Sequence, residues 1–286
     1  MRTRRFPVIV ARVWFVLCTV LVVAIEFVIC FTLRNAAEKK WISKRRSERI
    51  CCFSSGILMG KVLWFLSPQI HVKFMEGSLD WRGIENRGVF CACHTSFFDT
   101  IFFLWLCPVE YLLNVRSFAK RALWKMPLMG EVIRACGHLP VHFTAGGPSF
   151  AVDKEKQAVV SAAAESFLAD GGVLCFFPEG ALNPTPEVLT DFRLGTFSMV
   201  VKHQVPIHYI VYAGCSEVWD PALKGMPGFP ADVYVYVGKY EYDENATAVD
   251  VAKGLREEMQ RHLDDMLARR KKEQYVPFYK KSTARN

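Results

Sequence analysis

The sequence predicts an α/β protein, with a mixed, mostly parallel sheet flanked by helices behind an N-terminal membrane-anchoring helix or helix pair. Two observations lead to this prediction. Two apolar stretches stand near the start of the chain, and beyond them short apolar runs bounded by Gly, Pro or charge alternate with longer helical patterns. Strands that alternate with helices are typical of a sheet covered on both faces. We therefore divide the chain into an anchor over 1–72 and one domain over 73–286.

The first apolar stretch, 8–33, is interrupted by charge only at Arg12 and Glu26. As a helix it would measure roughly 39 Å, which exceeds a bilayer hydrocarbon core of about 30 Å. The stretch is longer than the apolar part of a secretory signal, and no small-residue cleavage site follows it. We therefore expect a retained signal anchor, with a buried core helix as the alternative.

The charged flanks of this stretch predict its orientation. Seven basic residues follow it between Arg34 and Arg49, whereas only Arg2, Arg4 and Arg5 precede it. The positive-inside rule then predicts that the domain over 73–286 lies in the cytosol. If the source is eukaryotic, we expect the membrane to be that of the endoplasmic reticulum.

The second apolar stretch, 50–66, carries Gly56, Gly60 and Lys61 in its middle. These interruptions favour an interfacial or re-entrant segment over a second span. The sequence thus predicts a membrane protein that is single-pass or monotopic.

Composition narrows the possible partners. A hydrophobic content of 51% excludes a disordered chain, and the net charge of +8 is compatible with nucleic acid, anionic membranes or phosphorylated substrates. The basic residues cluster beside the anchor and on the last helix, and no nucleic-acid reading motif is present, so we expect a membrane-lipid partner and no nucleic acid. The ten cysteines include no C-x-x-C pair, so we expect neither a metal site nor a disulfide framework.

The domain shows alternating elements along the chain. Continuous apolar runs are typical of buried parallel strands, and Gly or Pro residues mark their ends. The expected strands are 88–93, 137–143, 173–177, 205–212 and 232–237, and the expected helices are 100–113, broken at Pro108, then 153–170 and an amphipathic helix over 249–272.

The loop after the first of these strands reads His-Thr-Ser-Phe-Phe-Asp, with His94 and Asp99 five residues apart. On one continuous helix these side chains would point some 140° apart, so they meet only if His94 lies in the loop and Asp99 in the first helical turn. A carboxylate on one imidazole nitrogen fixes the tautomer and leaves the other nitrogen as a general base. No G-x-S-x-G nucleophile motif occurs, so the attacking hydroxyl can belong to the substrate.

The loop after the strand at 173–177 continues Pro178-Glu179-Gly180. The proline ends the strand, the glycine permits close backbone approach, and the carboxylate follows directly on the strand. Glu179 is either a turn residue or a functional group beside His94.

Together these motifs resemble the membrane glycerolipid acyltransferases of the 1-acylglycerol-3-phosphate acyltransferase type. In that family H-x4-D supplies the base and F-P-E-G helps to bind the acyl acceptor. The resemblance extends over roughly 81–212, and an N-terminal anchor is usual in the family. It implies His94 and Asp99 as catalytic residues, and as acceptor-binding residues Pro178, Glu179, Gly180, Arg193 and Lys120.

Two positions depart from the family pattern. Phe143 and Leu182 stand where the family usually has arginines that bind the phosphate of the acceptor. An arginine fork suits phosphate far better than either apolar side chain. Either Arg193, Lys120 and Arg116 replace the missing cations, or the acceptor is a lysophospholipid without a free phosphomonoester.

The resemblance implies transfer of an acyl chain from acyl-CoA, a co-substrate with no further cofactor, to a lysophospholipid such as 1-acylglycerol 3-phosphate. Backbone N–H groups near Gly180 would hold the oxyanion. Two alternatives are a catalytically silent lipid-binding protein and a thioesterase that uses Cys93. The second is disfavoured because Cys93 and His94, as neighbours on a strand, point to opposite faces.

Overall fold

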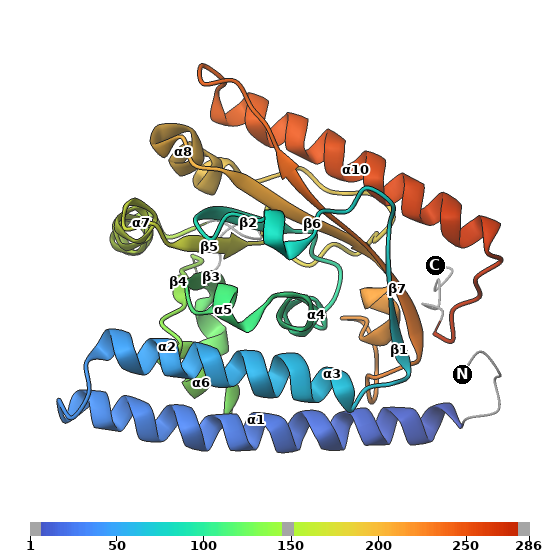
Figure 1. Cartoon of the computed structure of the whole chain (residues 1–286), viewed down its shortest axis with the longest axis horizontal. Coiled ribbons are helices and arrows are strands. Elements are labelled where there is room, and N and C mark those ends of the chain that lie inside the picture. Colours follow the sequence, from blue (N-terminus) through green and yellow to red (C-terminus); the bar gives the residue numbers. More distant parts are fainter. Residues whose placement is uncertain (1–6, 145–151, 280–286) are drawn as a thin grey trace.

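The computed structural model describes residues 7–144 and 152–279 (Figure 1). Within these ranges one sheet of seven strands has the order β1-β7-β6-β2-β5-β3-β4. Only the pair β6 and β7 is antiparallel there, so the predicted mixed, mostly parallel sheet is confirmed. The strands are β1 (Ile70–Phe74), β2 (Gly88–Ala92), β3 (Val115–Lys120), β4 (Leu139–Val141), β5 (Val173–Phe176), β6 (Ile207–Ala213) and β7 (Ala231–Tyr240).

Helices cover both faces of this sheet. The helices α8 and α10 lie on one face, whereas α4 lies on the other with α1 and α2 beneath it (Figure 1). Every residue of β2, β5 and β6 is buried as a result. The helices are α1 (Val8–Glu38), α2 (Lys44–Ser55), α3 (Leu63–Phe65), α4 (Asp99–Leu106), α5 (Val109–Leu112), α6 (Met129–Ala135), α7 (Lys154–Ala169), α8 (Leu194–His203), α9 (Cys215–Val218) and α10 (Ala248–Lys272), with a π-helix over Gly56–Val62 and 3₁₀ turns at Trp81–Gly83 and Arg121–Lys125.

Five strands and α-helices of the domain were not expected from the sequence, namely β1, β3, α6, α8 and α9. The strands β1 and β3 are only partly buried and carry His71, Lys73 and Arg116, so they lack a continuous apolar run. The predicted boundary between 72 and 73 falls inside β1, which pairs with β7 from its first residue to its last. That boundary is therefore wrong, because the sheet begins at Ile70.

The predicted anchor forms a helical hairpin that packs against the domain. The second arm begins at Lys44, earlier than predicted, and runs from α2 through the π-helix into α3. Gly60 lets this arm approach α4, since a Cβ there would stand 2.7 Å from the carbonyl oxygen of Leu104. Lys61 then donates to the carbonyls of Trp105 and Cys107 at the end of α4, at 2.8 and 2.7 Å. The residues that interrupt the apolar pattern thus hold the hairpin on the domain.

The two charged residues within the apolar stretch of α1 both turn toward the protein. The guanidinium of Arg12 donates to the carbonyl of Met226 at 2.8 Å and lies over the ring of Phe229. The carboxylate of Glu26, which is fully buried, accepts from the hydroxyls of Ser54 and Ser55 at 2.8 and 2.7 Å. The outward face of this stretch is therefore left to apolar side chains. The flanking residues Arg2, Arg4 and Arg5 lie outside the described residues.

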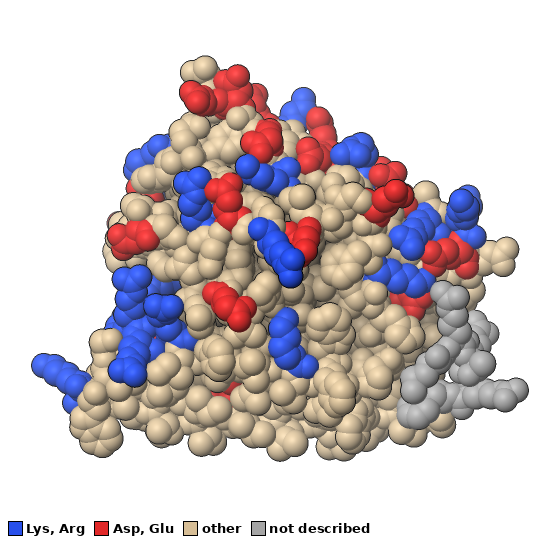
Figure 2. Space-filling model, viewed as in Figure 1, with Lys and Arg blue, Asp and Glu red and all other residues tan. Residues whose placement is uncertain are grey.

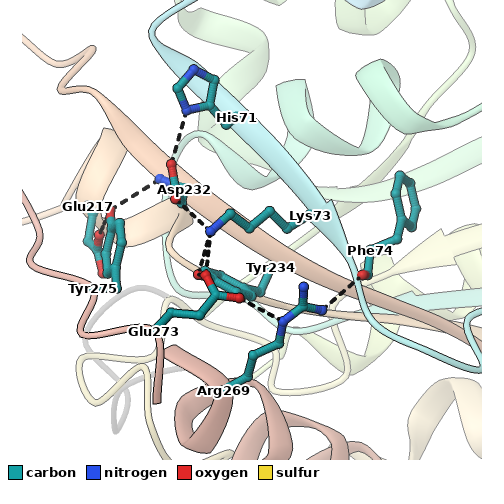
Figure 3. A network of polar contacts seen from close by, with 9 residues as sticks. All are labelled: His71, Lys73, Phe74, Glu217, Asp232, Tyr234, Arg269, Glu273 and Tyr275. Carbon is teal, nitrogen blue, oxygen red and sulfur yellow. Dashed lines mark hydrogen bonds and ion pairs between the residues drawn. The ribbon is translucent and has the colours of Figure 1, made fainter. Parts of the chain in front are cut away.

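A polar network fastens the end of α10 to the sheet edge (Figure 3). Lys73 of β1 forms ion pairs with Asp232 of β7 at 2.9 Å and with Glu273 at 2.6 Å. Glu273 also accepts from Tyr234 and Arg269 at 2.6 and 2.9 Å. The hydrogen bond from Lys73, followed by those from Tyr234 and Arg269, lowers the pKa of Glu273 to about 2.

This lowered pKa predicts a loss of stability in acid. A carboxylate whose folded pKa is about 2 contributes stability that is present above its unfolded pKa of about 4.5 and is lost as pH falls toward 2. We expect Glu273→Gln to lower Tm most above pH 5, with the difference from wild type vanishing between pH 4.5 and 2. Thermal melts across this range measure it. Glu76→Gln, at an exposed carboxylate beyond β1, is the control and should follow wild type throughout. A Tm difference between Glu273→Gln and wild type that stays constant across this pH range would contradict the link between the pKa of Glu273 and stability.

Candidate functional site

The loops after β2 and β5 meet at one edge of the sheet. These strands are parallel neighbours, with Cys91 of β2 opposite Phe176 of β5, so their carboxyl ends lie side by side. The first loop carries His94 and the second carries Glu179. The carboxyl edge of a parallel sheet is where such folds commonly place their sites.

His94 and Asp99 form a close pair. The Nδ1 of His94 lies 3.0 Å from Oδ2 of Asp99, which is the first residue of α4. The same oxygen accepts from the backbone N–H groups of Thr95 and Ser96 at 2.7 and 2.8 Å. Burial raises the pKa of Asp99, against the opposing effect of its bond to His94. The geometry is the one expected from the spacing, with the imidazole in the loop and the carboxylate in the first helical turn.

The imidazole keeps one nitrogen open. Its ring stacks on Phe177 with centroids 3.9 Å apart, and its side chain is 20% exposed. Because Asp99 accepts the proton on Nδ1, Nε2 carries the free lone pair, and within the described ranges it has no hydrogen-bond partner. An open basic nitrogen on a fixed ring can act as a general base.

Cys93 does not face this site. Its thiol is 1% exposed and donates to the carbonyl of Tyr212 at 3.7 Å. Burial raises its pKa well above the usual range, which suppresses the thiolate that a nucleophile requires. A thioesterase that uses Cys93 is therefore not supported.

The carboxylate of Glu179 is buried and fully engaged. Its Oε1 accepts the backbone N–H of His94 at 2.9 Å. Its Oε2 accepts from Nδ2 of Asn183 at 2.7 Å and from the N–H and hydroxyl of Thr190 at 3.0 and 2.9 Å. The side chain is 3% exposed. The carboxylate is thus turned into the protein, and direct binding of the acceptor by Glu179 stays a prediction.

Pro178 and Gly180 shape the same loop. The carbonyl of Pro178 accepts the N–H of Arg193 at 2.8 Å, and Gly180 has a φ of +73°, where a Cβ would stand 2.9 Å from Cγ of Arg193. The N–H of Gly180 donates to the carbonyl of Phe177 at 3.0 Å. The expected oxyanion donor at Gly180 is therefore already engaged in a turn.

The predicted cations fall into two groups. Arg116 forms an ion pair with Glu48 at 2.8 Å, so it joins β3 to α2 rather than serving the site. Lys120 ends β3, the strand next to β5, and Arg193 lies beside Gly180. Neither Lys120 nor Arg193 forms an ion pair within the described ranges. Both remain candidates for an anionic acceptor.

Sequence reasoning missed Asn183 and the hollow beside it. The N–H of Asn183 donates to the carbonyl of His94 at 2.6 Å. Next to this contact lies a pocket of about 240 Å³, lined by Thr95, Leu182, Asn183, Pro184, Pro186, Ser216, Asp220, Pro221 and Ala222. Over the part of the chain that the structure describes, no group of three His, Cys, Asp or Glu side chains is placed to hold a metal ion.

Comparisons with known proteins agree with this architecture. The sequence matches the Acyltransferase family over residues 69–213, which is half of the chain and contains both motif loops. The fold is similar to the crystal structure of the 1-acyl-sn-glycerophosphate (LPA) acyltransferase PlsC from Thermotoga maritima, with a TM-score of 0.67 and 19% identity over 94% of this chain and 98% of that chain. A search of curated proteins returned no match. The chain therefore belongs to the acyltransferase family, and the predicted type of enzyme is confirmed.

Proposed function

We propose that this enzyme transfers an acyl chain from a thioester donor, acyl-CoA, to a free hydroxyl of a lysophospholipid such as 1-acylglycerol 3-phosphate. The observation that carries the proposal is the His94–Asp99 pair, whose Nε2 is open while no thiol or hydroxyl nucleophile of the protein contacts it within the described ranges. The likeness to a lysophosphatidate acyltransferase fold supports the choice of substrate class.

The reaction then proceeds by direct transfer. Nε2 of His94 removes the proton as the lipid oxygen attacks the thioester carbonyl, and Asp99 stabilises the imidazolium. The tetrahedral intermediate collapses by breaking the carbon–sulfur bond, and the departing thiolate takes the proton from His94. The ester forms without a covalent acyl-enzyme.

Lys120 and Arg193 are our candidates for binding the phosphate of the acceptor, in place of the arginines absent at Phe143 and Leu182. Lys120 ends β3, the strand next to β5, and Arg193 donates its backbone N–H to the carbonyl of Pro178. A lysophospholipid with a masked phosphate is the second candidate, because of the two cations only Arg193 offers the guanidinium fork that binds a phosphomonoester bidentately.

A competition assay tests the function. Purified protein in detergent receives one labelled acyl-CoA with lysophosphatidate, lysophosphatidylcholine and glycerol 3-phosphate together, and a parallel reaction uses acyl carrier protein as donor. We expect labelled phosphatidate as the main product from acyl-CoA. Labelled phosphatidylcholine would select the masked acceptor, and transfer from the carrier protein alone would correct the donor. No acyl transfer to any lysolipid would refute the function.

We also propose that the hairpin attaches the enzyme to one leaflet, as a monotopic anchor with the domain in the cytosol. The helix α1 runs along the underside of the domain instead of projecting from it (Figure 1). Its outward residues form an apolar surface, visible as the tan lower face in Figure 2. These exposed residues are Ile9, Val10, Val13, Trp14, Leu17, Val20, Leu21, Ile25, Val28 and Phe31.

A basic groove lies on α2, the helix that packs beside α1. It measures about 460 Å³, and three of its lining residues are Arg45, Arg46 and Arg49 of α2. Juxtamembrane arginines of this kind attract anionic lipid head groups. The apolar face and the basic groove together suit an in-plane position at an anionic leaflet.

The anchor predicts a loss of vesicle binding in a defined variant. Leu17 and Leu21 are 61% and 59% exposed on α1, and burying a leucine side chain contributes about 1.5–3 kcal/mol. We expect Leu17→Glu with Leu21→Glu to reduce vesicle co-sedimentation more than tenfold without lowering Tm. Val159→Glu on α7, at an exposed valine outside the anchor, is the matched control. Equal binding of both proteins would contradict the in-plane anchor.

A further inference from the structure

We propose that Glu179 and Asn183 are positioning residues that clamp the backbone of His94, and that Glu179 does not bind the acceptor. The inference rests on the proposed acyl transfer and assigns a different task to the loop after β5. It follows from the contacts that this loop makes with one peptide of the loop after β2.

The clamp holds His94 from both sides. The N–H of His94 donates to Oε1 of Glu179 at 2.9 Å, and its carbonyl accepts the N–H of Asn183 at 2.6 Å. The side chain of Asn183 closes the arrangement by donating to Oε2 of Glu179 at 2.7 Å. Both polar groups of the His94 backbone are therefore fixed by the second loop, independently of the contact between the imidazole and Asp99.

The second loop is itself anchored to the domain. Oε2 of Glu179 accepts the N–H and the hydroxyl of Thr190. The adjoining Leu189 donates its N–H to Gln260 of α10 at 2.7 Å and accepts from Arg256 of α10 at 3.0 Å. The backbone of His94 is thus connected through Glu179 and the second loop to α10. Both the second loop and α10 therefore help to fix the position of the base.

The same contacts argue against a direct role for Glu179 with the acceptor. Oε2 already accepts three hydrogen bonds, Oε1 accepts one, and the side chain is 3% exposed. A hydroxyl of the acceptor would have to displace one of these donors to reach the carboxylate. A displaced donor would be left buried without a partner, at a cost of about 1–3 kcal/mol.

The test separates base positioning from acceptor binding and from partial unfolding. Each variant is assayed with two acceptors, lysophosphatidate and an analogue in which the reacting hydroxyl is a thiol. A thiol ionises near pH 8.5 without a base, so transfer to it depends little on His94. We expect Glu179→Gln to lower kcat with the hydroxyl acceptor about 100-fold, as for a misplacement of about 1 Å, with acceptor KM unchanged and transfer to the thiol kept within about threefold of wild type.

Two further variants keep the carboxylate. Asn183→Ala and Thr190→Val each remove donors to Glu179, and we expect the same selective loss of hydroxyl transfer, about 30-fold and about threefold. If Glu179→Gln does not fold, these two variants test the positioning role instead. Glu187→Gln, an exposed carboxylate in the same loop whose side chain makes no ion pair within the described ranges, is the matched control and should equal wild type.

Two other kinetic results for these variants would overturn the proposal that Glu179 and Asn183 position His94. A rise in acceptor KM for both acceptors at unchanged kcat would show that Glu179 binds the acceptor. An equal fall with hydroxyl and thiol would show a purely structural role. Wild-type protein that acylates no lysolipid would refute the proposed function instead, which keeps the two failures distinct.

Discussion

His94→Ala is expected to lower kcat for acyl transfer by about 10³-fold or more, with Tm within a few degrees of wild type. General-base catalysis by a positioned side chain contributes typically about 10²–10⁴-fold, and Nε2 of His94 is the open base of the site. Steady-state rates with acyl-CoA and lysophosphatidate measure the loss, and transfer to the thiol acceptor should survive.

A second histidine provides a matched control. His71 also contacts a carboxylate at 3.0 Å through Nδ1, but its partner Asp232 is held by Lys73 as well, and β1 lies three strands from β2 in the sheet (Figure 3). His71→Ala should leave kcat unchanged. A fall of equal size in both variants, or full activity of His94→Ala, would contradict the assignment.

Asp99→Asn is expected to cost about 10³-fold in kcat while preserving the loop. His94, Thr95 and Ser96 all donate to Oδ2, so an amide oxygen at that position keeps all three hydrogen bonds. The substitution removes the negative charge that stabilises the imidazolium, and its NH₂ takes the place of the buried Oδ1. The loss should therefore appear in kcat, with little change in acceptor KM.

Asp232→Asn is the companion control at the other pair. It removes an ion-pair partner of Lys73 and should lower Tm while leaving kcat unchanged. Tm values or crystal structures of both variants report the effect on stability, and steady-state kinetics report the effect on catalysis. An Asp99→Asn enzyme with wild-type kcat would show that the charge of Asp99 is dispensable.

The pair of His94 and Asp99 could be located from the sequence because its geometry is local. His94 and Asp99 lie within one loop and one helical turn, and the strand before them is a continuous apolar run. The central strands could be predicted because they too are continuous apolar runs. The edge strand β1 and the strand β3, which lies next to the edge strand β4, were missed because partly buried strands carry polar residues such as Lys73 and Arg116.

The role of Glu179 could not be read from its motif. Besides the N–H of His94, the donors to its carboxylate come from Asn183 and Thr190, which belong to an irregular loop with no periodic pattern. Whether a carboxylate after a strand faces substrate or protein depends on such tertiary contacts. The sequence also did not predict that Arg12 and Glu26 lie on the inner side of α1. Hydropathy shows that a charged residue is present, but not toward which side of the helix its side chain extends.

The course of α1 along the underside of the domain also bears on which acceptor concentration governs the rate. Under the proposed in-plane anchor the enzyme meets its acceptor by lateral diffusion, so its rate depends on molecules of acceptor per unit of membrane area rather than per unit of volume. Adding inert lipid at a fixed total amount of acceptor should then slow the enzyme by surface dilution. Adding aqueous buffer to the same vesicles should leave the acceptor dependence unchanged.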